Sequence, residues 1–190
     1  MSADTRAANR RMNVFADHAS VWLFGYGSLI FKAGFDYIER RPAYIRGWVR
    51  RFWQGSHDHR GTLAAPGRVL TLIRQPGACC QGMAYRVEPR VFEQLDVREK
   101  NGYLRLQTTL VFADDSTAEG LVYIATADNA AWLGVASEAV IAAQIAASAG
   151  PSGPNSEYLL RLADALRALD YEDAHVFAIE RQLRALEAHG

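Results

Sequence analysis

The amino-acid sequence predicts an α+β protein, with a small β-barrel, helices on one side of it, and a helical C-terminal third. Up to about residue 128, short apolar runs alternate with turn residues, which is typical of β-strands. After that point, apolar residues recur at three- and four-residue spacings, as they do in amphipathic helices. A run of strands followed by a run of helices favours the α+β class. Five or six antiparallel strands would suit a small barrel, open or closed.

The strands are expected in order along the first two thirds of the chain. The triplet Gln75-Pro76-Gly77 predicts a hairpin turn between two of them, and Gly47 interrupts another. Between Leu104 and Phe112, apolar and polar residues alternate, Arg105 among the polar ones, which predicts a half-buried strand. A turn at 113–116 lets the following strand pair back. The expected strands cover residues 21–26, 44–53, 69–74, 78–87, 104–112 and 120–125.

One helix is expected among the strands. Pro89 suits the first helical position, and Val91, Phe92 and Leu95 form its apolar face.

Three helices are expected in the C-terminal third, which covers about residues 130–188. Ser137 can cap an alanine-rich helix that runs to Ala149. Asn155 or Ser156 can cap the second helix, and Asp170 can begin the third. The apolar stripes of the last two helices last fewer than three heptads, so they predict core contacts and not a coiled coil. These stripes are Leu159, Leu162, Leu166 and Leu169, and Val176, Ile179, Leu183 and Leu186.

Length and composition are those of an ordinary globular protein. At about 150 residues per domain, 190 residues predict a single domain over 21–190, preceded by a flexible segment at 1–20. No apolar run approaches the roughly 20 residues that a membrane helix needs, and the N-terminal segment lacks the apolar core of a secretory signal. Cys79 and Cys80 are adjacent and suit no disulfide framework, so we expect a cytoplasmic protein with both thiols buried as small apolar groups.

Charge argues against nucleic acid as a partner, because 21 basic and 21 acidic residues cancel. The distribution is uneven, since 11 of the basic residues but only 5 of the acidic ones lie in residues 1–68. Two interpretations stay open: two solvated faces, or an N-terminal half that receives an anionic small molecule.

The stretch from Gly25 to Leu29 directly follows the first strand. A dinucleotide fingerprint would need glycine at position 30, which is isoleucine, and no Lys-Ser or Lys-Thr pair follows to make a phosphate loop. The stretch is therefore either a plain tight turn or a concavity of backbone N–H groups for a carboxylate or an oxyanion, to which Ser28 adds a hydroxyl.

A second polar stretch runs from Gln54 to Thr62. His57 and His59 could face the same way along a strand, but no third ligand is near, so a metal is not expected. Ser56, His57 and Asp58 are no catalytic triad, because neighbours on a strand point to opposite faces. The alternatives are a structural polar loop and a part of a binding site.

Glu99 lies between Arg98 and Lys100, where a helix is expected to end at Gly102. The negative end of the helix dipole would raise the pKa of its carboxyl, and the flanking cations would lower it. Glu99 is either an exposed loop carboxylate or a general acid or base.

Several of these stretches together resemble the ChaC family of glutathione-specific γ-glutamylcyclotransferases. They occur in family order over about residues 21–188. One departure is Leu63-Ala64, where the family is expected to have Pro-Glu. The matching stretches are Trp22-Leu23-Phe24-Gly25-Tyr26-Gly27-Ser28-Leu29, Arg51-Phe52-Trp53-Gln54-Gly55-Ser56, Asp58-His59-Arg60-Gly61-Thr62, Pro66-Gly67-Arg68-Val69, Arg98-Glu99-Lys100-Asn101-Gly102-Tyr103 and Gly150-Pro151-Ser152-Gly153.

The resemblance implies the γ-glutamylcyclotransferase-like barrel fold and the cleavage of glutathione to 5-oxoproline and Cys-Gly without metal or cofactor. It implies that Glu99 is catalytic and that the partner is a small molecule, with neither nucleic acid nor membrane. A monomer is favoured, and the oligomeric state stays open. The implied substrate-binding residues are Phe24, Gly25, Tyr26, Gly27, Ser28, Leu29, Gln54, Ser56, Arg60 and Tyr103.

Two alternative functions stay open at this point. The Leu63-Ala64 departure leaves room for other γ-glutamyl peptides or amines as substrates. The second alternative is a non-catalytic regulator of the cation-transport-regulator type, which would bind a small molecule. The presence of Glu99 argues against the regulator, since a pure binding module has no use for a base beside the substrate amine.

Overall fold

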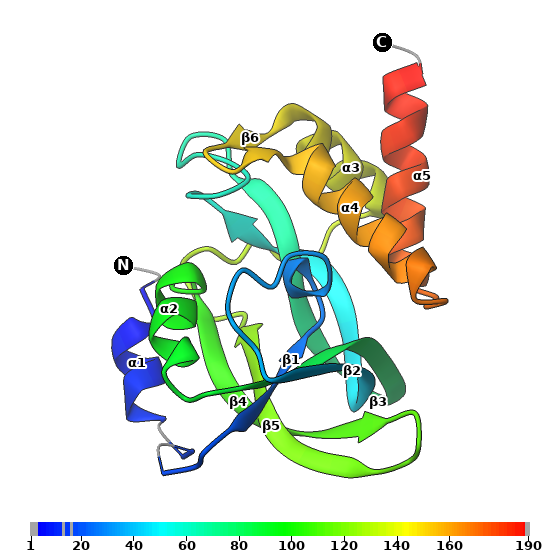
Figure 1. Ribbon diagram of the computed structural model, residues 1–190. Helices are drawn as coiled ribbons and strands as arrows, with labels where there is room; N and C mark the ends of the chain where they lie inside the picture. The colour runs from blue at the N-terminus through cyan, green and yellow to red at the C-terminus, as the bar shows by residue number, and fades with distance from the viewer. Residues whose placement is uncertain (1–3, 13, 16, 189–190) are drawn as a thin grey trace. The chain divides into compact units, whose positions relative to one another are not determined.

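The computed structural model describes residues 4–12, 14–15 and 17–188 (Figure 1). The chain divides into two compact units. Unit 1 holds the described residues up to Val49 together with Arg74–Ala130, and unit 2 holds Arg50–Ile73 and the chain from Ala131 onward. Two long strands pass from one unit to the other.

Five strands form a closed barrel in the order β1-β3-β2-β4-β5 (Figure 1). β1 pairs in parallel with β5 and antiparallel with β3, and β4 pairs antiparallel with both β2 and β5. The predicted α+β class and the small barrel, here with mixed strand directions, are confirmed. The strands are β1 (Val21–Gly25), β2 (Glu39–Ser56), β3 (Gly67–Val87), β4 (Tyr103–Phe112) and β5 (Thr117–Ala125).

The predicted hairpin at Gln75-Pro76-Gly77 is wrong, because β3 continues through it as one strand of 21 residues. Gly77 does have a positive φ of 81°, so the triplet changes the local path of the chain. The chain does not reverse there. In a hairpin the two halves of β3 would pair with each other, but the second half pairs with β1, from Val21 opposite Val87 to Gly25 opposite Met83. In the same way β2 continues through Gly47, whose φ is 78°.

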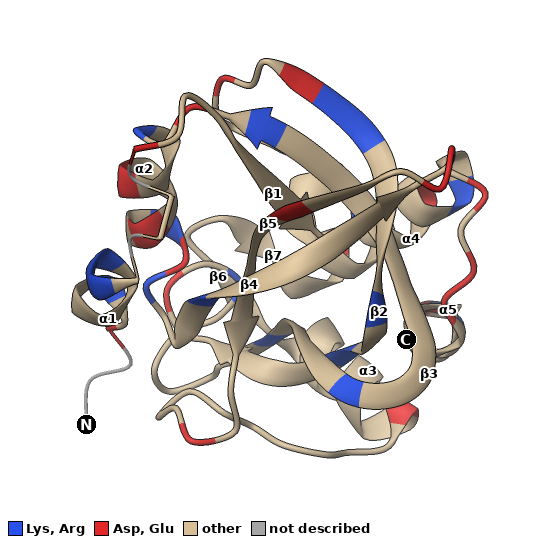
Figure 2. Cartoon of the chain, turned by 90° about the horizontal axis from the view of Figure 1, so that it is seen from below, with Lys and Arg blue, Asp and Glu red and all other residues tan. Residues whose placement is uncertain are grey.

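Unit 1 also holds three short helical segments: α1 (Arg6–Arg11), the 3₁₀ turn η1 (Ser28–Ile30) and α2 (Val91–Arg98). α2 confirms the helix expected among the strands, and it begins two residues after Pro89. Its predicted apolar face is buried, with Val91, Phe92 and Leu95 at most 8% exposed. Sequence patterns predicted no helix at α1, which lies beside α2 (Figures 1 and 2).

Unit 2 contains α3 (Glu138–Ala147), the two-residue strands β6 (Ala149–Gly150) and β7 (Gly153–Pro154), α4 (Asn155–Ala168) and α5 (Ala174–Ala188). The three helices pack on one another through side chains that are fully buried, which confirms most of the predicted stripes. Two residues are corrections: Leu169 is half-buried and lies just after the end of α4, and Leu186 is 47% exposed near the end of α5.

One of the three predicted helix starts is confirmed. The Ser137 hydroxyl accepts a hydrogen bond from the Val140 N–H (3.4 Å) and caps α3. α4 follows Pro154 without a side-chain cap, so neither Asn155 nor Ser156 caps it. α5 begins at Ala174 and not at Asp170, since the Asp173 carboxylate accepts the Val176 N–H (3.1 Å).

Candidate active site

The turn after β1 folds tightly back on itself in unit 1. The N–H of Ile30 donates to the Gly27 carbonyl (2.9 Å), and the N–H of Lys32 donates to the Ser28 carbonyl (2.8 Å). A Cβ on Gly25 would lie 2.6 Å from the Leu29 Cβ, so the close approach of these two residues needs glycine at position 25. Gly27 has a negative φ of −126°, so it does not have the positive φ that a glycine-flanked turn can require.

Burial divides the predicted binding residues of this turn into two kinds. Phe24, Tyr26 and Leu29 are at most 7% exposed, and the Tyr26 hydroxyl donates to the Tyr123 carbonyl (2.7 Å). Gly27 and Ser28 are half-buried. A ligand can therefore meet the turn at Gly27 and Ser28, while its other side chains belong to the interior of unit 1.

Arg98 joins this turn to the end of α2. Its guanidinium donates to the Ser28 hydroxyl (2.9 Å) and to the carbonyls of Ala33 (2.6 Å) and Lys32 (3.2 Å). Its Nε lies 3.4 Å from Oε1 of Glu99. A guanidinium offers only donors, so the Ser28 hydroxyl accepts here and keeps its own hydrogen for another acceptor. Sequence reasoning treated Arg98 only as a charge beside Glu99, although it stands within a matching motif.

α2 ends at Arg98, before the predicted end at Gly102, and Glu99 is its C-cap. The N–H of Glu99 donates to the Leu95 carbonyl (2.8 Å), and its side chain is 17% exposed. The chain then turns through Gly102, whose φ is 90°, and enters β4 at the half-buried Tyr103. The result is a partly accessible carboxylate beside the guanidinium that holds Ser28, an arrangement that can bind an amine and exchange a proton with it.

A buried polar network lies at the base of α2. The Tyr123 hydroxyl donates to Asp96 Oδ1 (2.7 Å), and the Arg105 guanidinium donates to Asp96 Oδ2 (2.8 Å). Burial and the hydrogen bond to Asp96 raise the pKa of Tyr123, and the charge of Glu99 adds to this effect. The pattern of β4 placed Arg105 on its polar face, which is wrong, because Arg105 is 4% exposed and paired with Asp96. No spacing in the sequence signals this network.

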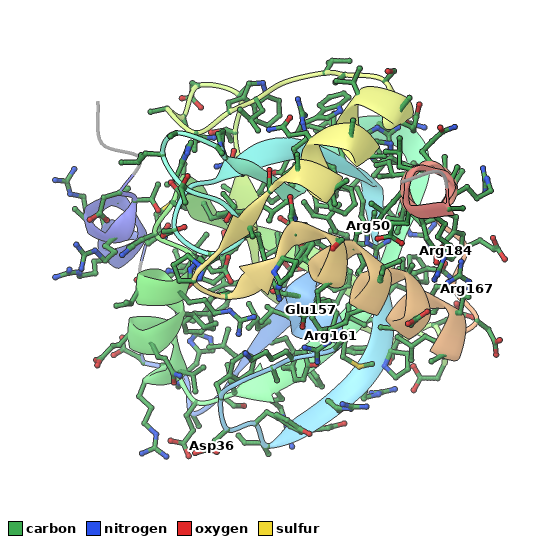
Figure 3. All side chains as sticks on the ribbon, turned by 90° about the horizontal axis from the view of Figure 1, so that it is seen from above. Asp36, Arg50, Glu157, Arg161, Arg167 and Arg184 are labelled. Carbon is green, nitrogen blue, oxygen red and sulfur yellow. The ribbon has the colours of Figure 1, made fainter. Side chains whose placement is uncertain are left out.

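The remaining predicted binding residues lie in unit 2 and are buried there. Gln54 is 0% exposed and forms a β-bridge with Trp132. The Ser56 hydroxyl accepts the Arg60 N–H (3.0 Å). The Arg60 guanidinium donates to the Pro154 carbonyl (2.9 Å) and to Glu157 (3.0 Å), which is labelled on α4 in Figure 3. Within unit 2, Ser56 and Arg60 stabilise the loop after β2, and Gln54 pairs β2 with the segment at Trp132.

The other candidate groups have simpler roles. His59 Nδ1 lies 3.2 Å from the Ser152 hydroxyl, and no three His, Cys, Asp or Glu side chains of the described residues are grouped as metal ligands. Cys80 is buried as expected, but Cys79 is exposed, because successive side chains of β3 alternate between its faces. In the part of the chain that the structure describes, no helix combines the length and apolar character needed to cross a membrane.

Comparison with known proteins extends this description. The family model for ChaC-like proteins matches residues 21–186. The chain is 43% identical over 183 residues to glutathione-specific γ-glutamylcyclotransferase 1 of Danio rerio, which covers 91% of this chain and 93% of the relative. Its identity to the human protein of the same name is 42% over 173 residues, or 86% of this chain and 78% of the relative.

A solved structure also resembles this chain along nearly its whole length. A crystal structure of a glutathione-specific γ-glutamylcyclotransferase from yeast superposes with a TM-score of 0.84 at 32% identity, over 91% of this chain and 99% of the yeast chain. The resemblance seen in the sequence motifs is thus confirmed over nearly the whole length, and the chain belongs to the ChaC-like family.

Proposed function

We propose that this protein is a γ-glutamylcyclotransferase that cleaves glutathione into 5-oxoproline and Cys-Gly. The relatives described above carry this activity in their names. In this chain, one observation supports the proposal most directly: the Arg98 guanidinium contacts both Ser28 of the turn and the Glu99 carboxylate. A binding group and a proton-transfer group are thereby held together within unit 1.

The reaction is an intramolecular aminolysis. The α-amine of the γ-glutamyl group attacks its own γ-carbonyl carbon, a C–N bond forms to close a five-membered lactam, and the amide bond to cysteine breaks. No protein nucleophile is required, because a well-oriented intramolecular attack can reach an effective molarity on the order of 10⁵ M or more. The chemistry requires neither a metal nor a cofactor.

Glu99 supplies the proton transfers. The α-ammonium must lose a proton before it can attack, and the departing cysteine amine must gain one. A single carboxylate can accept the first proton and deliver it to the leaving group, so both steps balance without another acid or base. The partial exposure of Glu99 at the end of α2 gives a substrate amine access to it.

The turn after β1 binds the γ-glutamyl group. The N–H groups of Ile30, Phe31 and Lys32 donate within the turn, and the donors proposed for the substrate are the N–H groups of Gly27 and Ser28 and the Ser28 hydroxyl. Donors of this kind can also stabilise the negative oxygen of the tetrahedral intermediate. Tyr103 of unit 1 and Gln54, Ser56 and Arg60 of unit 2 stay predicted substrate-binding residues.

The substrate range is the finer part of the proposal. Leu63 replaces the proline expected in the family and is 86% exposed. Release of 5-oxoproline from glutathione compared with γ-Glu-Ala measures whether the preference for glutathione is retained. A protein that releases 5-oxoproline from neither would be a binding regulator instead. Because glutathione is a thiol and Cys79 and Cys80 are both reduced thiols, we also propose a cytoplasmic, reducing location.

The decisive experiment is 5-oxoproline release from glutathione by Glu99→Gln beside the unmodified protein. The change is nearly isosteric, so the fold should survive while turnover falls by about 10²- to 10⁴-fold, or roughly 3–5 kcal/mol in the barrier. Glu93→Gln is the matched control, because Glu93 is an exposed carboxylate on the same helix. Activity of Glu99→Gln within threefold of the unmodified protein would contradict the assignment.

A further inference from the structure

The N-terminal helix α1 contacts the chain directly after Glu99. Both the N–H and the hydroxyl of Thr5 donate to the Lys100 carbonyl, at 3.0 and 3.1 Å. The Gly102 N–H donates to the same oxygen (3.0 Å). Thr5 stands at the N-cap of α1, where a threonine hydroxyl usually caps its own helix. Here the hydroxyl instead holds the Lys100–Asn101 peptide, one residue beyond Glu99.

Asn9 of α1 makes the second contact, with the start of β4. Its side chain is fully buried, the amide nitrogen donates to the Tyr103 carbonyl (3.0 Å), and the amide oxygen accepts the Arg105 N–H (2.9 Å). β2 pairs with β4 near the other end of that strand, at Phe112 and Val111. At residues 103–105 the Asn9 amide therefore takes the place of a neighbouring strand.

The character of α1 indicates that it is held by these contacts and not by its own stability. A six-residue helix is far too short to persist alone in water, and its sequence, RAANRR, has no apolar stripe. The side chains of Thr5 and Asn9 bind backbone groups between Lys100 and Arg105. A segment that stabilised the barrel in general would bury apolar surface, whereas α1 forms polar bonds with one short stretch.

That stretch is also fixed from the opposite side. Asp96 of α2, three residues before Glu99, is bound to Arg105 and Tyr123. Arg105 thus holds α2 through its guanidinium and α1 through its N–H. The backbone before Glu99 is anchored to the barrel, and the backbone after it is anchored to α1.

We propose that α1, through Thr5 and Asn9, is a positioning element that sets the orientation of the Glu99 carboxylate, an inference that rests on the proposed function. Glu99 lies where the helical hydrogen bonds of α2 end, so the direction of its side chain depends on the backbone that follows, from Lys100 onward. A displacement of about 1 Å in a reacting group can cost 100-fold in rate. α1 lies outside residues 21–186, the part matched by the family model, so the device belongs to the chain's own N-terminal segment.

The test uses the full-length chain with Thr5→Val and Asn9→Leu. Thr5→Val keeps the shape of the side chain and removes the hydroxyl, and Thr5→Ser restores the hydroxyl. Arg10→Gln, at an exposed position of the same helix, is the control. We expect kcat for 5-oxoproline release to fall about tenfold to 100-fold in the first two variants with KM changed less than about twofold. Thr5→Ser and Arg10→Gln should stay near the unmodified value.

A second measurement does not depend on activity. Amide hydrogen exchange at Arg105 should accelerate in Asn9→Leu, because its N–H loses its acceptor. An unchanged kcat in Thr5→Val and Asn9→Leu would overturn the inference, even if the melting temperature falls, because α1 would then be only structural. If Asn9→Leu does not fold, the comparison of Thr5→Val with Thr5→Ser decides.

The two proposals fail in different ways. Loss of activity in Glu99→Gln together with full kcat in Thr5→Val and Asn9→Leu would refute the positioning role and leave the proposed function in place. Full activity in Glu99→Gln would refute the assignment of Glu99 and the positioning role with it.

Discussion

Arg98 joins the two parts of the candidate site in unit 1, the turn at Ser28 and the carboxylate of Glu99. A guanidinium presents several donors in a fixed plane, so it can hold the Ser28 hydroxyl and the Ala33 carbonyl and still lie beside Glu99. A lysine at this position would offer one compact charge and could not span these acceptors. The identity of the residue therefore matters beyond its charge.

Ser28→Ala tests whether the Ser28 hydroxyl binds the substrate. If the hydroxyl binds the substrate carboxylate, its loss removes a hydrogen bond to a charged group, roughly 1.5–3 kcal/mol, or about tenfold to 100-fold in kcat/KM. The pH profile of kcat/KM should not change, because the proposed proton-transfer group, Glu99, is intact in this variant. A purely structural turn predicts a changed melting temperature with an unaltered kcat/KM, so both quantities are measured on this variant.

Arg98→Lys extends that prediction to the pair. Because Arg98 donates to the Ser28 hydroxyl, the two substitutions should not be additive, and the double variant should lose less kcat/KM than the product of the single losses. Arg90→Lys is the matched control, since Arg90 is a solvent-exposed arginine just before the same helix. Additive losses would mean that Ser28 and Arg98 act independently on the substrate.

At the scale of the element, the start of α4 depends on a residue that looks like a helix cap and has another role. Asn155 is fully buried, and its side chain accepts the Arg68 N–H (2.6 Å) and donates to the Arg68 carbonyl (2.9 Å). It thereby fastens α4 to the beginning of β3 within unit 2.

We predict that Asn155→Ala destabilises the protein strongly. The substitution leaves two buried backbone groups of Arg68 without their partner, at about 1–3 kcal/mol for each. Ser156→Ala should change the melting temperature very little, because no side chain caps this helix. Thermal unfolding of both variants checks the prediction. A larger fall in melting temperature for Ser156→Ala than for Asn155→Ala would mean that Ser156 caps α4 and would contradict the role given to Asn155.

The elements of this fold were predictable where a local pattern decides them. Strand alternation and helical periodicity located β1, β4, β5, α2 and the three C-terminal helices, and Ser137 was identified correctly as a cap. The errors at Gln75-Pro76-Gly77 and Asn155 share one cause. Each local signal is real, but a distant partner decides its outcome: β1 pairs with the second half of β3, and Arg68 engages the Asn155 side chain.

The same distinction applies to the candidate site. Glycine-flanked turns and a glutamate at a helix end can be recognised from neighbouring residues, so Ser28 and Glu99 could be proposed as site residues from the sequence. Arg98 as a clamp, the Asp96–Arg105–Tyr123 network and the contacts of α1 depend on residues up to 96 positions apart. Neither charge nor periodicity shows which distant backbone group a side chain will meet.

Across the described residues, the balance of 21 basic and 21 acidic residues in the sequence is accompanied by ion pairs at several buried charges. Asp173 pairs with Arg50 (3.2 Å), and Glu180 of α5 is bound by Arg167 and Arg184, which lie close together in Figure 3. Burial raises the pKa of Glu180, but the hydrogen bonds from both arginines outweigh it, so the pKa lies below its usual value. This carboxylate therefore stabilises the fold above its unfolded pKa of about 4.5, and the contribution is lost as the pH falls further.

A buried histidine should make the folded state lose stability at a higher pH than the carboxylate of Glu180 does. His175 is 9% exposed, and its Nε2 accepts the Phe52 N–H (3.1 Å), so a proton on that nitrogen would oppose another donor. Burial lowers the pKa of His175 below 6.5, and the charge of Arg51 adds to this, while Asp173 and Glu138 act in the opposite direction. In the unfolded chain His175 therefore takes up a proton near pH 6.5, whereas in the folded protein it does so only at a lower pH.

The stability of the folded state should accordingly be highest above about pH 6.5 and should begin to decline as the pH falls below that value, before any carboxylate with an ordinary pKa titrates. His175→Gln removes the titrating group and can still accept the Phe52 N–H through its amide oxygen. Its unfolding free energy, measured in urea between pH 5 and 7.5, should depend less on pH than that of the unmodified protein, even if it is lower throughout. His18→Gln is the control, because His18 is exposed. Equal pH slopes for the unmodified protein and His175→Gln would show that the decline has another origin.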